Sequence, residues 1–383
     1  MSKIKAVITD CDLITAYGRG IKPLWEGILS GKSQVSKFNR FPRQQFISQI
    51  AAIIPELSLL KSDSLVMQML KIILTPNLKI IPKDAAFFLA TTAGEIDLLE
   101  KEVLNKATLH KKNKLTDFLN KVKLLLKIKD PGMLISCACA SSSSAIAEAA
   151  RMIEGGEKDC ILVIAADAVS EFVFSGFSAL MALDKEPAKP FAKNRRGLSL
   201  GEGAGFILLM SAKRAKKEKR NVLAQVAGWG LSCDANHMTG PARNGEGLTK
   251  AIASALKKAH LTLNQIHCIS GHGTGTLYND AMELTAFKNI FKKRTIPVYS
   301  IKGGTGHTLG AAGLIETILA LKVLREKTIP QTVGLKIIDP QAKNWASTST
   351  RKLKSPLIML NNCGFGGINT VLILKPLLKN IND

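Results

Sequence analysis

One plan of sequence occurs twice in this chain, and no other feature constrains the fold as strongly. Residues 133–135 form a short apolar run that leads into small residues and then a helical pattern. Residues 305–321 repeat the order of small residues followed by an amphipathic helical pattern. The first copy continues into the apolar segment 159–166, which is typical of a strand in a parallel sheet covered on both faces. The repeat predicts a duplicated α/β unit whose two helix N-termini meet at the centre.

The length of the chain agrees with two fused halves, because 383 residues exceed a single typical core. The sharpest change in composition is the charged run at residues 211–221. We therefore divide the chain into an N-terminal half, 1–215, and a C-terminal half, 216–383. The N-terminal half includes a loosely patterned region, about 41–130, which we interpret as a variable cap.

Residues 114–127 of this cap form a basic amphipathic helical pattern. Such a helix lies on a membrane surface or packs its leucine face on its own protein, and we favour the second arrangement. No uncharged apolar run approaches the ~20 residues of a membrane span. The apolar stretch near the N-terminus is too short for a signal peptide. We therefore expect a cytoplasmic protein without stable membrane insertion.

The cysteines support the same compartment. They number seven, are scattered, and lie mostly in apolar runs, which favours reduced thiols over a disulfide framework. Cys137 and Cys139 form a C-x-C pair, but no second Cys or His cluster at metal-ligand spacing accompanies them. We therefore expect no metal site.

The net charge of +23 predicts an acidic partner. Only 5% of the residues are aromatic, which leaves little surface for stacking nucleic-acid bases. We therefore expect no binding to nucleic acid.

Cys139 lies between the first predicted strand and its helix, with four serines close behind it. At such a position the unpaired backbone N–H groups and the helix dipole lower a thiol pKa from its free value of about 8.5. This arrangement can prepare a thiolate nucleophile. The alternative is a small buried cysteine without a chemical role.

Three polar, glycine-rich segments interrupt the C-terminal half. They contain His272, then Lys302 and His307, and finally the glycine loop at residues 361–369. Each segment taken alone could be a turn, in which glycine and polar residues are common. Together with Cys139 they supply a nucleophile, two histidines and a lysine, which is what acyl transfer requires. A fourth glycine-rich segment, 197–205, lacks the Gly-Lys-Ser/Thr ending of a phosphate loop.

These motifs and their order resemble the β-ketoacyl-[acyl-carrier-protein] synthases of the thiolase-like superfamily. The matching segments are 138–141, 201–205, 232–239, 272–276, Lys302 with 306–307, and 364–367. The resemblance implies an α/β protein with a duplicated thiolase-like fold, layered α-β-α-β-α with two mixed sheets and buried central helices.

The resemblance also implies a decarboxylative Claisen condensation. Cys139 would accept an acyl chain from a carrier-protein thioester, with the backbone N–H groups of Cys139 and Phe365 as oxyanion hole. A malonyl-carrier thioester would then lose CO2, while neutral His272 and His307 donate hydrogen bonds to the enolate oxygen. Attack of the carbanion on the acyl-Cys139 carbonyl would give a 3-oxoacyl-carrier protein.

Further residues take supporting roles in this resemblance. Lys302, with Glu316 as its partner, would support the histidines, and Asp280 and Glu283 would anchor the loop after His272. Phe365 would also be the gate between the acyl and extender pockets. Contacts to the substrate and its pantetheine arm are implied for His237, Thr239, Thr274, Thr276, Phe365, Gly366 and Gly367.

The implied partners are an acidic acyl carrier protein and a second copy of the chain, with a ketosynthase-like subunit in a heterodimer as the alternative. No cofactor is implied, because the phosphopantetheine arm belongs to the carrier. The pathway would be fatty-acid biosynthesis or, more in keeping with the departures below, type II polyketide or polyene biosynthesis. An alternative function is a weakly active or regulatory, chain-length-factor-like subunit. The presence of Cys139 argues against a pure chain-length factor.

Two groups of residues depart from the family pattern. Ala192, Asn194 and Arg196 stand where relatives have acidic residues, which removes acids of a structural ion-pair network. Cys137 replaces a Thr or Ser, and Cys363 replaces an aromatic residue before the glycine loop. We expect Cys363 to widen the gate region and change which acyl chains fit.

Overall fold

The computed structural model describes residues 4–60, 62–104 and 114–376. Most of its strands belong to one long sheet that consists of two halves with the same internal order. The N-terminal half runs, from its edge inward, β6 (Met133–Ile135), β5 (Ala86–Ala90), β7 (Cys160–Asp167), β9 (Gly203–Ser211) and β1 (Ala6–Thr15). The C-terminal half runs β12 (Val298–Tyr299), β11 (Ile269–Ser270), β15 (Ile358–Gly364), β16 (Ile368–Lys375) and β10 (Ala224–Cys233).

The two halves also share their pairing pattern. In each, the two outer pairs of strands are parallel and the two inner pairs are antiparallel. The predicted mixed sheets are therefore present. They are continuous with each other, because Val7 and Ile8 of β1 pair with Gln225 and Ala224 of β10.

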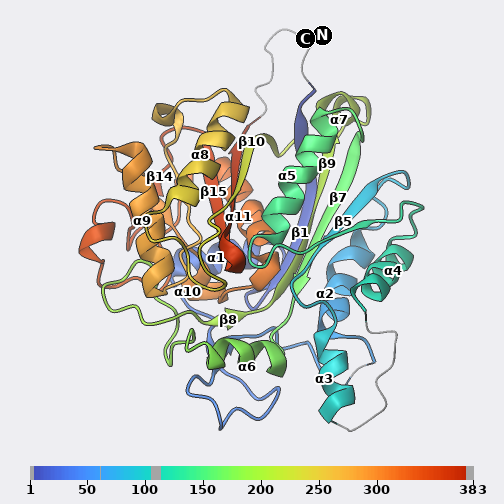
Figure 1. Cartoon of the computed structure of the whole chain (residues 1–383). Helices are drawn as coiled ribbons and strands as arrows, with labels where there is room; N and C mark the ends of the chain where they lie inside the picture. Colours follow the sequence, from blue (N-terminus) through green and yellow to red (C-terminus); the bar gives the residue numbers. More distant parts are fainter. Residues whose placement is uncertain (1–3, 61, 105–113, 377–383) are drawn as a thin grey trace.

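Three of the four hydrophobic clusters in the described residues fill the space between the layers of helices and strands. α5 (Ser141–Glu154) and α11 (Ala312–Glu326) lie between the two halves of the sheet, and both are buried along most of their length. α2 (Leu65–Leu74) and α4 (Leu115–Leu126) cover the outer face of the N-terminal half. α8 (Glu246–Ala259) and α9 (Leu277–Phe291) cover the C-terminal half. Figure 1 shows α5 and α11 in the middle of this α-β-α-β-α arrangement.

The amphipathic helix predicted in the cap is α4, and its apolar face packs inside the protein. Phe118, Val122 and Leu126 are fully buried in the core shared with α2 and the N-terminal strands. α4 therefore packs on its own protein, as favoured from the sequence. Within the described residues, no helix combines the length and apolar character needed to cross a bilayer.

The remaining elements connect and cover these layers. α7 (Ala212–Lys217) occupies the charged run between the halves, so the proposed division after residue 215 falls inside it. The other helices are α1 (Ile21–Ser30), α3 (Ile96–Leu104), α6 (Glu171–Ala179) and α10 (Lys302–Thr305). The short strands are β2 (Gly18–Arg19), β3 (Ser36–Lys37), β4 (Ile50–Ala52), β8 (Leu200–Gly201), β13 (Thr328–Ile329) and β14 (Arg351–Lys352). The 3-10 turns are η1 (Thr75–Asn77), η2 (Leu263–Gln265), η3 (Leu309–Ala311), η4 (Pro340–Ala342) and η5 (Phe365–Gly367).

Candidate active site

Cys139 lies in a tight turn between β6 and α5. The hydroxyl of Ser141 accepts a hydrogen bond from the backbone N–H of Cys137 (2.8 Å) and donates one to the carbonyl of Ala138 (2.6 Å). Gly364, at the end of β15, packs so close that a Cβ there would lie 3.2 Å from the backbone nitrogen of Cys139. The serine and the glycine therefore fix the Cys139 backbone against the C-terminal half.

Two buried histidines from the C-terminal half meet Cys139. The Cys139 sulfur and one ring nitrogen from each of His272 and His307 all lie within 4.8 Å of one another. The two rings meet edge to face with centroids 5.1 Å apart. His272 Nδ1 and both ring nitrogens of His307 have no hydrogen-bond partner in the described chain. These nitrogens are therefore available to a substrate.

Carboxylates hold the loop that carries His272. Glu283 accepts hydrogen bonds from the backbone N–H groups of His272 and Gly273, each 2.7 Å long. Asp280 accepts from the backbone N–H of Thr274 at 3.0 Å. Asn361 of β15 donates to Glu283 at 2.7 Å, which links the loop to the sheet.

His307 is fixed through its backbone, so its ring stays free. Its N–H donates to the carbonyl of Ser199 (2.7 Å), and its carbonyl accepts from the N–H of Gly201 (3.1 Å). A Cβ on Gly201 would clash with the carbonyl of Thr305, so only glycine permits this close approach. The glycine-rich segment at 197–205 thus serves the active site as a backbone support.

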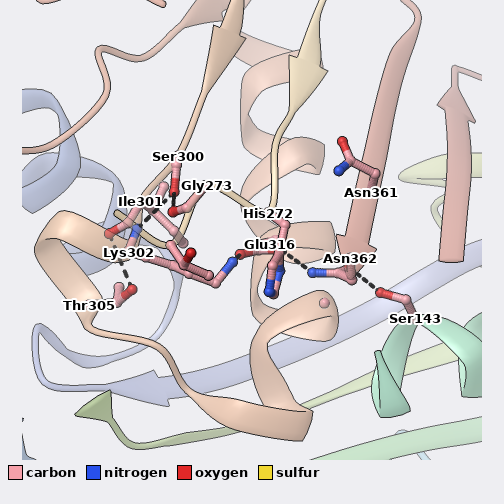
Figure 2. Close-up of polar contacts among 12 residues, drawn as sticks. Ser143, His272, Gly273, Ser300, Ile301, Lys302, Thr305, Glu316, Asn361 and Asn362 are labelled. Carbon is pink, nitrogen blue, oxygen red and sulfur yellow. Dashed lines mark hydrogen bonds and ion pairs between the residues drawn. The ribbon is translucent and has the colours of Figure 1, made fainter. Parts of the chain in front are cut away.

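A buried polar chain lies behind the histidines. Lys302 forms an ion pair with Glu316, Asn362 donates to Glu316 Oε2 at 2.7 Å, and the Ser143 hydroxyl donates to Asn362. Figure 2 shows these four side chains in a row across the two halves. Neither Lys302 nor Glu316 lines the substrate cavity. Both lie one layer behind it.

Sequence reasoning missed several residues of this site. Ser143 belongs to the serine run and Asn362 to the third polar segment, so both were within reach of the motifs but had no assigned role. Asp167, the only acid in its apolar strand, accepts hydrogen bonds from the Thr91 hydroxyl (2.8 Å) and the N–H of Gly310 (2.7 Å). It ties the loop before α11 to the N-terminal sheet.

The electrostatics correct one expectation. Burial raises the pKa of Cys139 to about 11, even though the Lys302 charge and the backbone N–H groups of Phe365 and Cys139 act to lower it. The expected lowering by the helix N-terminus is therefore wrong for the free enzyme, because enclosure of the sulfur outweighs it. The thiol is protonated at neutral pH.

The histidines are held in the neutral state. Burial, together with the positive charge of Lys302, places the pKa values of His272 and His307 well below the usual value of 6.5. Neutral imidazoles can accept the thiol proton or donate a hydrogen bond. Cys139 and the two histidines are also the only metal-ligand-type cluster found among the described residues. The Lys302 charge that lowers both histidine pKa values would likewise repel a cation.

Cys139, His272 and His307 line a cavity of about 830 Å³. Most of the substrate-contacting residues expected from the sequence line it, namely His237, Thr239, Thr274, Thr276, Phe365 and Gly367. Gly366 is not among its lining residues, and its N–H donates to the carbonyl of Met238 instead. Phe365 stacks on Phe177 with centroids 5.6 Å apart, so the expected gate has a partner that the sequence did not reveal. Cys363 also lines the cavity.

The segment at 190–197 contains no acidic residue, yet its Arg195 forms an ion pair. Arg195 is only 7% exposed, forms an ion pair with Asp339, and lies 3.8 Å from Asp280. An acid from a distant part of the chain thus supplies the counter-charge that this segment itself lacks.

Comparisons with known proteins agree with this geometry. Residues 91–215 match the family model described as "Beta-ketoacyl synthase, N-terminal domain", and residues 223–336 match "Beta-ketoacyl synthase, C-terminal domain". A 3-oxoacyl-[acyl-carrier-protein] synthase 2 from Coxiella burnetii is 30% identical over 411 residues, covering 98% of this chain and 99% of the relative. The chain belongs to the β-ketoacyl synthase family. The family and the enzyme class predicted from the sequence are therefore confirmed.

Solved structures agree with this family membership. "The ishigamide ketosynthase/chain length factor" superposes with a TM-score of 0.90 at 25% identity, covering 98% of this chain and all of that one. A structure of a type II PKS acyl-carrier protein in complex with its ketosynthase, bound to the hexaketide, gives a TM-score of 0.88 at 25% identity, with the same coverage. The predicted thiolase-like fold is confirmed.

Proposed function

We propose that this β-ketoacyl synthase joins an acyl group on Cys139 to a malonyl extender held by an acyl carrier protein, with loss of CO2. The observation that carries the proposal is the meeting of the Cys139 sulfur with one nitrogen from each of two neutral histidines within 4.8 Å. This set supplies a nucleophile, proton acceptors and hydrogen-bond donors in one cavity.

In the first step, the acyl chain moves from the carrier to the enzyme. The Cys139 sulfur bonds to the acyl carbon, and the bond from that carbon to the pantetheine sulfur breaks. Because burial holds the pKa of Cys139 at about 11, its proton leaves during attack, through a neutral histidine, to the departing thiolate. The backbone N–H groups of Cys139 and Phe365 stabilise the tetrahedral oxyanion.

In the second step, a malonyl-carrier thioester loses CO2. The electron pair of the broken C–C bond forms an enolate, whose oxygen accepts hydrogen bonds from neutral His272 and His307. The enolate carbon then bonds to the acyl carbonyl carbon and the bond from that carbon to the Cys139 sulfur breaks. The Cys139 thiolate takes up a proton from solvent. Burial, supported by the positive charge of Lys302, lowers the pKa of both histidines, which keeps them neutral and able to donate to the enolate.

The cavity mouth suits a pantetheine arm on an acidic carrier. Thr274 and Thr276 offer hydroxyls, and the side chains of Arg196 and Arg243 bring positive charge to the same cavity. No cofactor beyond the carrier's pantetheine arm is needed for the steps above. Seven free cysteines support a reducing, cytoplasmic location.

The assembly is proposed from the family resemblance of the sequence, and the pathway from the names of the relatives together with Cys363. We propose a homodimer that works in fatty-acid or, in keeping with Cys363, type II polyketide or polyene biosynthesis. A heterodimeric role beside a second subunit is the alternative, favoured by the similarity to a ketosynthase/chain length factor structure. The complete Cys-His-His set supports an active rather than a regulatory chain.

Loading of Cys139 tests the first step. The intact protein is incubated with a panel of acyl-carrier thioesters and its mass is measured. We expect a mass increase of one acyl group, absent in Cys139→Ala and retained in Cys11→Ser, a cysteine control that lies outside the cavity. Acylation that survives in Cys139→Ala would contradict the proposal, and the acyl groups that load would identify the pathway.

A further inference from the structure

A second cavity, of about 440 Å³, lies at the other end of the C-terminal sheet from the joint between the halves. It opens beside the edge strand β12 and the short strand β14. Figure 1 shows β14 on the α9 side of the molecule. It shares no lining residue with the active-site cavity. Four cations line it, namely Arg294, Arg351, Lys352 and Lys354.

Arg294 is held rigidly at this cavity. Its guanidinium donates to the carbonyls of Leu263 and Ile266, each at 2.6 Å, and to Nδ1 of His267 at 3.3 Å. A guanidinium has five N–H donors in a planar fork, so donors remain for a ligand after these contacts. Because its position is fixed, little side-chain entropy is lost when an anion binds.

The positive charge has no internal counter-ion. No described carboxylate lies within ion-pair distance of any of the four cations, and none lines the cavity. The acceptors that contact Arg294 are neutral. Elsewhere in the described chain, buried or half-buried arginines such as Arg40, Arg195 and Arg214 form ion pairs with acids. Arg43 is a further half-buried arginine without an acid partner among the described residues, so what distinguishes this cavity is that it gathers four cations with no carboxylate among its lining residues.

His267 completes the wall without adding a charge. Burial lowers its pKa, and the positive charges of Arg294 and Lys354 lower it further. The neutral ring accepts from Arg294 at one nitrogen, and the other nitrogen can donate to an anion. The titratable groups that face the cavity are these five, and all of them favour an anionic occupant.

We propose that this cavity is a binding site for the phosphate or diphosphate group of a small molecule. Two arginines can bind phosphate oxygens in bidentate fashion, and two lysines at the rim add point charges. The volume lies within the range typical of small-molecule pockets, about 300–1,000 Å³, and a concave site of this size suits a small ligand better than a protein surface. The site is independent of the proposed condensation.

Thermal unfolding and calorimetry test this site with inorganic phosphate and diphosphate, at constant ionic strength against chloride. A ligand that binds only the folded state raises Tm, and the rise grows with the logarithm of ligand concentration above Kd. We expect diphosphate to raise Tm and to bind at least about tenfold more weakly to the double variant Arg351→Gln/Lys354→Gln. Adenosine 3′,5′-bisphosphate forms a second arm, which separates free diphosphate from a phosphate carried on a larger molecule.

The matched control is Lys213→Gln/Lys216→Gln, which removes the same charge from exposed positions of α7. It should bind diphosphate like the unmodified chain, and both double variants should still load Cys139. Equal binding by the control and the cavity variant would contradict the proposal, because the effect would then be general charge screening. Binding of an acidic protein to this face, with no response to either phosphate probe, would also overturn it.

Discussion

The two halves of the molecule share one framework and divide the chemistry between them. In both, the strands have the same order, the edge strand (β6 or β12) leads toward a central buried helix, and the loop before that helix carries a reactive side chain. The N-terminal half places Cys139 before α5, whereas the C-terminal half places His307 before α11. The nucleophile and one of the two enolate donors thus occupy corresponding positions. A duplicated scaffold became an asymmetric site through its loops, without a change in strand order.

The helices themselves differ at their contact. α5 begins with serines whose hydroxyls reach the C-terminal half: Ser142 accepts from the N–H of Leu314 (2.9 Å), and Ser144 meets the Thr370 hydroxyl (2.9 Å). α11 has Gly313 at the matching place, where a Cβ would clash with the hydroxyl of Ser143. α5 thus provides the polar contacts, and the missing side chain at Gly313 of α11 leaves space for the serine hydroxyls. The predictions below test this division of labour.

The largest effect is expected for His307→Ala. Removing this ring leaves the Cys139 nucleophile in place, so acylation should survive, while decarboxylation should fall by about 10³-fold because one enolate donor is lost. Mass spectrometry measures the first step, and release of labelled CO2 from malonyl-carrier protein measures the second. Equal losses in both steps would show that the division between the halves is wrong.

The next effect concerns the polar chain behind the histidines. Asn362→Ala leaves Glu316 Oε2 and the Ser143 hydroxyl without their buried partner, which should cost about 3 kcal/mol of unfolding free energy. Ser144→Ala is the matched control, because it removes a contact between the halves that does not reach Glu316. It should cost about 1 kcal/mol. Denaturant unfolding compares the two variants, and similar losses would remove the special role of Asn362.

The pH dependence of thiol alkylation tests whether burial or the helix dipole has the larger effect on the pKa of Cys139. With a pKa of about 11, the thiolate fraction of Cys139 should rise about tenfold per pH unit between pH 7 and pH 10. The rate of alkylation by iodoacetamide, followed by mass spectrometry with Cys139→Ala as control, should rise accordingly. A plateau below pH 8 would mean that the helix N-terminus, not burial, governs the free thiol.

The smallest effect is expected at the departure from the family pattern. Cys363→Phe places in the cavity wall the aromatic side chain that the family resemblance leads us to expect there, and it should narrow the space beside Phe365. We expect loading of the longest accepted acyl chain to fall about tenfold relative to the shortest, which is within the range for steric discrimination in a pocket. Competition between two acyl-carrier thioesters measures the ratio. An unchanged ratio would remove Cys363 from the specificity determinants.

Much of the fold could be predicted because its signals are local. Continuous apolar segments marked the parallel strands, and the repeated order of small residues and helix revealed the duplication. Glycine-rich loops around His272 and Lys302 indicated the site in the same way. These features depend on neighbouring residues, which sequence patterns report.

The features that escaped prediction depend on residues that are distant in sequence. Ser143 and Asn362 are 219 positions apart, and Arg195 and Asp339 are 144 positions apart, so no local pattern joins either pair. The raised pKa of Cys139 has the same origin. A helix N-terminus is visible in the sequence, whereas enclosure of the sulfur by the C-terminal half exists only after folding.

A single-turnover condensation tests the central claim most directly. Acyl-loaded enzyme is mixed with malonyl-carrier protein labelled at the free carboxylate, and the products are followed by mass spectrometry and CO2 release. The account predicts one 3-oxoacyl-carrier protein and one labelled CO2 for each acyl group lost from Cys139, and no 3-oxoacyl product in Cys139→Ala. Transfer of the acyl group without loss of CO2, or condensation by the Cys139→Ala variant, would contradict it.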